Sequence, residues 1–116
     1  MSSLDVSRAV DQLSALAQET RLNVLRMLIK SGSEGVPATE IAERLGVRQN
    51  LMSSHLSALV RAGLTRTRRE GRRVYHSIDL EATGTLLKFL NEELNSHARA
   101  DAFGNAPVGT DARRSA

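Results

Sequence analysis

The 116-residue sequence contains no cysteine and no tryptophan, and only 3% of its residues are aromatic. Without cysteine, the chain has no disulfides, no thiolate metal ligands and no thiol-based redox sensing. Apolar residues make up 41% of the sequence, so the predicted core consists mainly of leucine, valine, isoleucine and alanine. The length is that of a single domain.

The sequence also lacks an apolar run near the roughly 20 residues that a membrane-spanning helix needs, and it lacks a signal-peptide pattern. Both absences favour a cytoplasmic protein. Its three histidines are well separated, and it contains neither a glycine-rich phosphate loop nor a paired-carboxylate arrangement. We therefore predict that the protein is not an enzyme and that it holds no cofactor and no metal.

Acidic residues are scarce in one stretch of the chain. Residues 48–73 contain seven arginines and a single acid, Glu70, which gives a local charge of +6 in a chain whose net charge is +3. A basic region on a mildly acidic body is typical of a protein that binds the phosphates of nucleic acid, although an ordinary solvated surface is the alternative. The seven arginines are Arg48, Arg61, Arg66, Arg68, Arg69, Arg72 and Arg73.

Apolar periodicity predicts four helices in the first half of the chain. The first runs from Asp5, a candidate cap, to Ala17. The second covers residues 20–30 and is apolar on nearly every side, so we expect it to be the central buried helix. Pro37 suits the first turn of a third helix that ends at Leu45, and Gly46 suits the C-terminal cap of that helix. A fourth helix is predicted over residues 49–62.

The fourth helix has two distinct faces. The predicted inward stripe is Leu51, Met52, His55, Leu56, Leu59 and Val60. The opposite face carries short or planar hydrogen-bonding side chains and no carboxylate: Gln49, Asn50, Ser53, Ser54 and Ser57. A helix that enters the major groove of DNA needs such side chains, whereas an ordinary solvent face usually carries glutamate and lysine. Asn50 is predicted either to read a base or to cap the helix.

Strand-forming residues on both sides of Glu70-Gly71 predict a β-hairpin that turns at these two residues. Two helices joined by a tight glycine-containing turn and followed by a hairpin form a winged helix-turn-helix, which is a mainly α fold of the α+β class. The predicted phosphate contacts are Arg48, Arg66, Arg68, Arg69, Arg72 and Arg73. Because strand residues alternate between faces, about half of the arginines in the hairpin can face DNA at once.

A last helix is predicted from Leu80, and it carries more apolar surface than one small core needs. We therefore expect it to pair with the first helix across a two-fold dimer interface, although it could instead close the monomer core. The predicted interface residues are Val6, Val10, Leu13, Leu86, Leu87, Leu90 and Leu94. Residues 1–97 then form the DNA-binding and dimerisation domain, and residues 98–116 form a disordered tail.

From Leu13 to Leu94 the chain resembles the ArsR/SmtB family of bacterial winged-helix repressors. The resemblance is carried, in this order and spacing, by Leu16–Leu25 (LAQETRLNVL), Glu40–Val47 (EIAERLGV), Gln49 with Ser53–Leu59 (SSHLSAL), and Ala62–Leu64 (AGL) followed by Arg68–Tyr75 (RREGRRVY). It implies a homodimer built on the first and last helices, an inverted-repeat operator in double-stranded DNA, and repression that an inducer relieves. The inducer is either a small organic molecule bound between the dimer helices or absent.

The resemblance also identifies positions where other members of the family bind metals. The metalloid sensors carry two cysteines at the start of the third helix, where this chain has Pro37 and Thr39. The zinc sensors carry histidines on the last helix, where the register puts Ala82, Glu93 and Ser96. We therefore expect a repressor that lacks the usual metal ligands. The alternatives are a metal-responsive repressor with an atypical site and a winged-helix module for protein–protein contact, which the arginine-rich hairpin does not favour.

Overall fold

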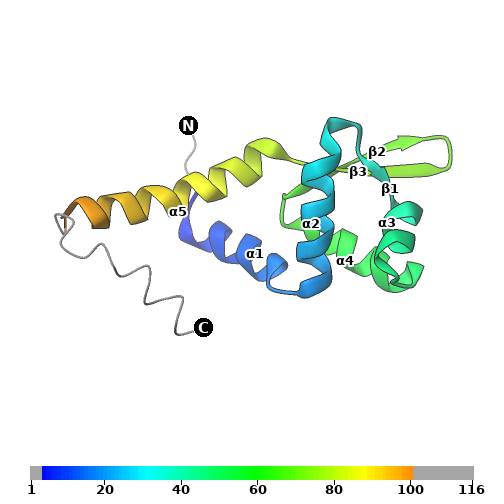
Figure 1. Ribbon diagram of the computed structural model, residues 1–116, viewed down its shortest axis with the longest axis horizontal. Coiled ribbons are helices and arrows are strands. Elements are labelled where there is room, and N and C mark those ends of the chain that lie inside the picture. Colours follow the sequence, from blue (N-terminus) through cyan, green and yellow to red (C-terminus); the bar gives the residue numbers. More distant parts are fainter. Residues whose placement is uncertain (1–3, 101–116) are drawn as a thin grey trace. The chain divides into compact units, whose positions relative to one another are not determined.

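The computed structural model describes residues 4–100, and within this range the chain forms a winged helix-turn-helix with a small antiparallel sheet (Figure 1). This confirms the predicted α+β class. The helices are α1 (Val6–Leu16), α2 (Glu19–Ser31), α3 (Ala38–Leu45), α4 (Gln49–Arg61) and α5 (Leu80–Ala100), with a short 3-10 turn η1 (Gly32–Glu34). The strands are β1 (Val36–Pro37), β2 (Thr65–Glu70) and β3 (Arg73–Ile78). None of these helices is long and apolar enough to cross a membrane.

Side-chain caps start the first two helices. The Asp5 carboxylate accepts a hydrogen bond from the Arg8 backbone N–H at 2.8 Å, as the sequence predicted. The Gln18 side-chain oxygen accepts one from the Arg21 N–H at 2.9 Å. Glutamine is an uncommon capping residue, but here it satisfies one of the free N–H groups in the first turn of α2.

The core lies between α2, α3, α4 and the sheet. Its fully buried side chains include Leu28 of α2, Ile41 of α3, and Met52 and Leu59 of α4. Each of these helices turns one side toward the others, which is the arrangement that a 3.6-residue apolar period encodes.

Two helices bury less of their apolar surface than the sequence suggested. In α2, Leu22 and Ile29 are 44% and 49% exposed, so the prediction of a helix buried on nearly all sides is wrong. In α4, Leu51 is 49% exposed and Val60 is 36% exposed, so the inward stripe is narrower than predicted. In each case the neighbouring elements cover only one side of the helix.

Gly46 ends α3 and forms the tight turn of the helix-turn-helix. Its φ of 67° is in the left-handed region, which glycine adopts without the steric cost of a Cβ. The backbone N–H of Val47 then donates to the Ala42 carbonyl at 3.0 Å and closes the turn. Pro37 was predicted in the first turn of α3, but the helix begins one residue later, at Ala38. Pro37 itself belongs to β1 and pairs with Tyr75 in the sheet.

The sheet has the order β1-β3-β2, and its β2–β3 hairpin is the wing (Figure 1). Glu70 pairs with Arg73, so the turn consists of Gly71 and Arg72 and is one residue later than predicted. Gly71 has a φ of 62°, which the first position of a tight two-residue hairpin turn requires.

Asp79 connects the sheet to α5. Its Oδ1 accepts a hydrogen bond from the Ala82 backbone N–H at 3.0 Å and caps α5, which starts at Leu80 as predicted. Residues up to Leu86 pack as one unit, and the rest of α5 is described by itself. The helix continues through Ala100, so residues 98–100 of the predicted tail are helical. The rest of that tail, residues 101–116, lies outside the described residues.

Candidate nucleic-acid interface

The polar face of α4 is exposed to solvent along its whole length. All five predicted reading residues lie on it: Gln49, Asn50, Ser53, Ser54 and Ser57. No residue of α4 is acidic. The helix therefore presents hydrogen-bonding groups without any carboxylate that phosphates would repel.

Arg61 belongs to the same face, although the sequence alone predicted no role for it beyond its charge. Asn50, Ser54, Ser57 and Arg61 follow one another at spacings of four, three and four residues, which puts them on one stripe of a helix. All four are exposed. The spacing was the signal in the sequence that places Arg61 on this surface.

Asn50 lies inside the first turn of α4 and is not its capping residue. The helix begins at Gln49, and Arg48, which precedes it, makes no capping hydrogen bond with its side chain. The Asn50 Oδ1 accepts a hydrogen bond from the Leu51 N–H at 2.9 Å. Asn50 therefore satisfies part of the first turn while remaining exposed on the polar face.

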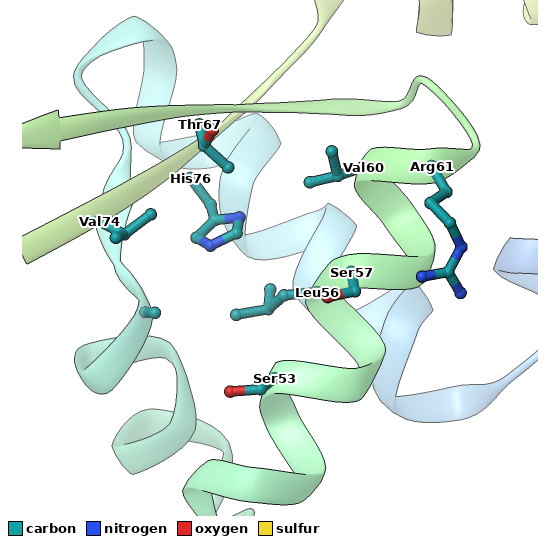
Figure 2. Close-up of a pocket in the computed structure, with 9 residues that line it drawn as sticks. Ser53, Leu56, Ser57, Val60, Arg61, Thr67, Val74 and His76 are labelled. Carbon is teal, nitrogen blue, oxygen red and sulfur yellow. The ribbon is translucent and has the colours of Figure 1, made fainter.

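One face of the wing is turned toward α4. Antiparallel pairing puts Thr67 opposite His76 and Arg69 opposite Val74, and side chains directly opposite each other share a face. Figure 2 shows the inner side chains beside α4, around a surface hollow of about 430 Å³. The hollow is lined by Ala38, Ser53, Leu56, Ser57, Val60, Arg61, Thr67, Val74 and His76.

His76 is the buried polar group of this hollow. It is 6% exposed, and burial lowers the pKa of its imidazole from the ordinary value of 6.5. The ring points from β3 toward Leu56 of α4, and its Nδ1 has no hydrogen-bond partner among the described residues (Figure 2). A neutral, buried imidazole packs the wing against α4 and contributes no positive charge for binding phosphate.

The other face of the wing carries three arginines that contact the protein's own groups. Arg66 pairs with the Asp79 carboxylate at 3.3 Å. Arg68 lies over the Tyr75 ring, 4.4 Å from its centroid, donates to the Glu34 carbonyl at 3.1 Å and pairs with Glu70 at 3.4 Å. Arg73 lies on the same ring, 5.7 Å from the centroid.

Arg69 and Arg72 differ from these three arginines. Both are exposed, and neither takes part in an ion pair within the part of the chain that the structure describes. Arg69 lies on the inner face with the hollow, and Arg72 lies in the turn at the tip of the wing. The sequence had given all the wing arginines one role, and the register separates them into two groups.

Exposed apolar side chains lie on α1 and α5, where the sequence predicted a dimer interface. On α1, Val6, Val10 and Leu13 are 67%, 53% and 41% exposed. On α5, Leu87 and Leu90 are exposed, whereas Leu86 is only 4% exposed and is buried within its own chain. A surface for a second copy would therefore use the neighbours of Leu86 rather than Leu86 itself. The side chain of Leu94 lies outside the described part of the structure.

Possible metal ligands do not converge in the described part of the chain. No group of three or more His, Asp or Glu side chains there lies close enough together to hold a metal ion. The side chains of Glu93 and Ser96, two of the positions at which the zinc sensors of the ArsR/SmtB family carry histidines, are not among those described.

Comparison with known proteins assigns this chain to a family. A family model described as a helix-turn-helix domain matches residues 16–68. The transcriptional activator HlyU of Vibrio cholerae is 32% identical to this chain, over 73% of this chain and 76% of its own length. A solved structure of HlyU superposes with a TM-score of 0.61, over 72% of this chain and 88% of that one. ArsR2 of Halobacterium salinarum, whose name assigns it to an arsenical resistance operon, is 35% identical over 73% of this chain and 70% of its own length. This chain belongs to the ArsR family.

The ArsR-family chain is therefore a DNA-binding transcriptional regulator and not an enzyme. A solved ArsR-like regulator from Rhodococcus sp. RHA1 shares the fold, with a TM-score of 0.70 over 88% of this chain and 93% of that one, at 23% identity.

Proposed function

We propose that this protein is a homodimeric repressor that binds an inverted-repeat operator in double-stranded DNA, with the α4 helix of each subunit in the major groove of one half-site. The main support is the exposed, carboxylate-free face of α4 next to an arginine-bearing wing. Acidic groups on such a face would be repelled by DNA phosphates, and hydrogen-bonding amides and hydroxyls can read the edges of bases.

Within this proposal, residues at the start of α4 read sequence and the wing holds the backbone. Gln49 can bond to adenine through both groups of its side-chain amide, and Ser53 and Ser54 can donate to or accept from several bases. Asn50 and Ser57 extend the same polar face. In the wing, Arg69 and Arg72 are the first candidates for phosphate contacts, because among the described residues their guanidinium groups are held neither by a carboxylate nor by the Tyr75 ring.

The proposed dimer uses the exposed apolar side chains of α1 and α5. A two-fold dimer explains why α1, whose other side buries Ala9 and Ala15, also carries an exposed row at Val6, Val10 and Leu13. Two copies of α4 separated by one turn of the duplex, about 34 Å, would match the two halves of an inverted repeat.

Repression in the cytoplasm is the proposed regulatory outcome, because a dimer seated on a promoter excludes other proteins from the same DNA. HlyU of Vibrio cholerae is named an activator, so transcription in vitro from the gene's own promoter, with and without the protein, decides the direction. A repressor lowers the yield of transcript, and an activator raises it. A metal-responsive variant of the proposal would release DNA on titration with zinc, and a small-molecule inducer would release it without any metal.

The central experiment measures binding to the chain's own promoter region by fluorescence anisotropy. A dimer that neutralises roughly six to ten phosphates loses about 10³ to 10⁵ in affinity between 50 and 200 mM salt. Gln49→Ala should reduce discrimination between operator and random DNA, whereas Arg72→Ala should weaken both equally and reduce the salt slope by about 1 for each half-site. Lys30→Ala, which removes an exposed charge at the end of α2, is the control and should change neither. Equal affinity of the wild type for every duplex would refute the proposal.

A further inference from the structure

A second hollow lies beside α4, at a position that the wing does not occupy. It has a volume of about 330 Å³ and lies between α1, α2 and α4. Its lining residues are Asp11, Ser14, Ala15, Arg21, Ala58, Arg61 and Ala62. Ala58 borders this hollow and Val60 borders the hollow beside the wing. Two residues along a helix differ by about 200° in direction, so Ala58 and Val60 lie on nearly opposite sides of α4, and Arg61, which borders both hollows, lies between them.

The walls of this hollow are fixed by hydrogen bonds between helices. The buried Gln12 side chain of α1 donates from Nε2 to the Ala62 carbonyl at the end of α4, at 3.1 Å. Arg21 donates from Nε to the Nδ1 of His55, in the middle of α4, at 3.1 Å. The backbone N–H of Arg21 donates to the side-chain oxygen of Gln18. The half-buried Arg21 is therefore held at its backbone by Gln18 and at its side chain by His55.

Two guanidinium groups border the hollow, those of Arg21 and Arg61. Neither arginine forms an ion pair among the described residues. The single carboxylate in the lining is that of Asp11, so the two cations leave a net positive charge. Arg61 also ends the exposed stripe of α4, which connects the hollow directly to the proposed reading face.

A helix in the major groove has a phosphodiester strand on each side of it. The wing can supply contacts on one flank of α4 only. We propose that Arg21 and Arg61 bind a backbone phosphate of the operator on the other flank, so that α4 is held between two phosphate contacts. This inference rests on the proposed binding of an operator by α4.

The hydrogen bond between Arg21 and His55 gives this contact a second effect, because it fixes the rotation of α4 about its axis. Side chains project roughly 5 to 6 Å from a helix axis, so a rotation of about 20° moves their ends by about 2 Å. Base-edge hydrogen bonds tolerate only a few tenths of an ångström. His55 is therefore a positioning residue, and the hydrogen bond that its Nδ1 accepts from Arg21 links the phosphate contact to the orientation of the reading face.

The decisive variant is Arg61→Gln, because Arg61 is exposed at the end of α4 and is not part of the core. Operator binding is measured between 50 and 200 mM salt. We expect Arg61→Gln to lose roughly tenfold in affinity for operator and random DNA alike and to reduce the salt slope by about 1 for each half-site. The matched control is Arg26→Gln, which removes an exposed arginine of α2 that bonds to Asn23. It should keep the wild-type affinity and slope.

Three further variants test the sign of the charge effect and the role of His55. Asp11→Asn removes the carboxylate from the hollow and should strengthen binding roughly two- to fivefold, the size of one partly screened charge. His55→Leu removes the acceptor for Arg21 and should reduce the discrimination between operator and random DNA. His55→Asn, which offers an oxygen acceptor near the position of Nδ1, should restore most of this discrimination. Because the readout is a ratio of affinities, a change in stability alone does not alter it.

Several results would overturn the inference while leaving the proposed function intact. The first is a wild-type protein that discriminates its operator while Arg61→Gln keeps the wild-type affinity and slope. The second is binding of inorganic phosphate that Arg61→Gln abolishes without changing operator binding, which would assign the hollow to a free anion. The third is unchanged discrimination in His55→Leu. If the wild type itself fails to discriminate, it is the proposed function that fails.

Discussion

His76 and the wing arginines show that single residues of this surface have separate tasks. His76 joins the wing to α4 as a neutral group, since it is 6% exposed and its Nδ1 has no described partner. Arg66 and Arg68 are held by Asp79, Tyr75 and neighbouring carbonyl or carboxylate groups. The positive charge that is free to meet phosphate is therefore smaller than the arginine count suggests.

Burial of His76 makes the stability of the fold depend on pH. Its pKa is lowered in the folded protein, so as the pH falls the unfolded chain, with the ordinary value of 6.5, takes up the proton first. Stability is therefore fully present above 6.5 and decreases as the pH falls below it. We expect the urea midpoint of the wild type to fall between pH 7 and pH 5, and that of His76→Leu to fall less. Parallel pH profiles for the two proteins would contradict this.

The residue-level roles that the sequence did not predict depend on tertiary partners. Exposure of the reading residues followed from helical periodicity, and the prediction that half of the wing arginines share a face followed from strand alternation. Which of these arginines face α4 depends on how β2 pairs with β3. The turn between these two strands lies one residue later than the sequence predicted. The stacking of Arg68 on Tyr75 and the bond from Arg21 to His55 join residues far apart in the chain or across strands, and no local pattern predicts them.

At the scale of elements, the helices and the hairpin followed from local signals in the sequence. Asp5, Gly46 and the apolar period each specify structure within a few residues, and the boundaries they predicted were close to those observed. The exposure of Leu22 in α2 and Leu51 in α4 was not predicted, because it depends on which neighbours cover a helix. Local patterns fix where an element lies in the chain, and packing fixes how much of it is buried.

Glycine at the turn between α3 and α4 is required by backbone geometry alone. A Cβ at Gly46 would meet no atom within 4 Å, so Gly46→Ala costs only the left-handed φ, about 1 kcal/mol of folding free energy. Gly84 of α5 also has open space around it, but its φ is not positive. Gly84→Ala should therefore stabilise the protein by up to about 1 kcal/mol. Chemical denaturation measures both, and effects of the same sign would contradict this account.

At the scale of the whole molecule, the proposed recognition of an inverted repeat depends on a second copy of the chain. We expect Val10→Asp to shift the protein from dimer to monomer in sedimentation equilibrium, because it puts a charge in the apolar stripe of α1. Operator affinity should then fall by more than about 100-fold, since one half-site is lost for each molecule. Leu22→Asp is the matched control, with a leucine 44% exposed on α2, and it should remain a dimer. A wild type that is monomeric at micromolar concentration would exclude this assembly.

Asp79 connects the start of α5 to the base of the wing through its two carboxylate oxygens. One oxygen of its carboxylate holds the first turn of α5, through Ala82, and the other holds Arg66 at the base of the wing. We therefore expect a ligand that displaces the start of α5 to shift the Arg66 end of the wing as well, through this one carboxylate.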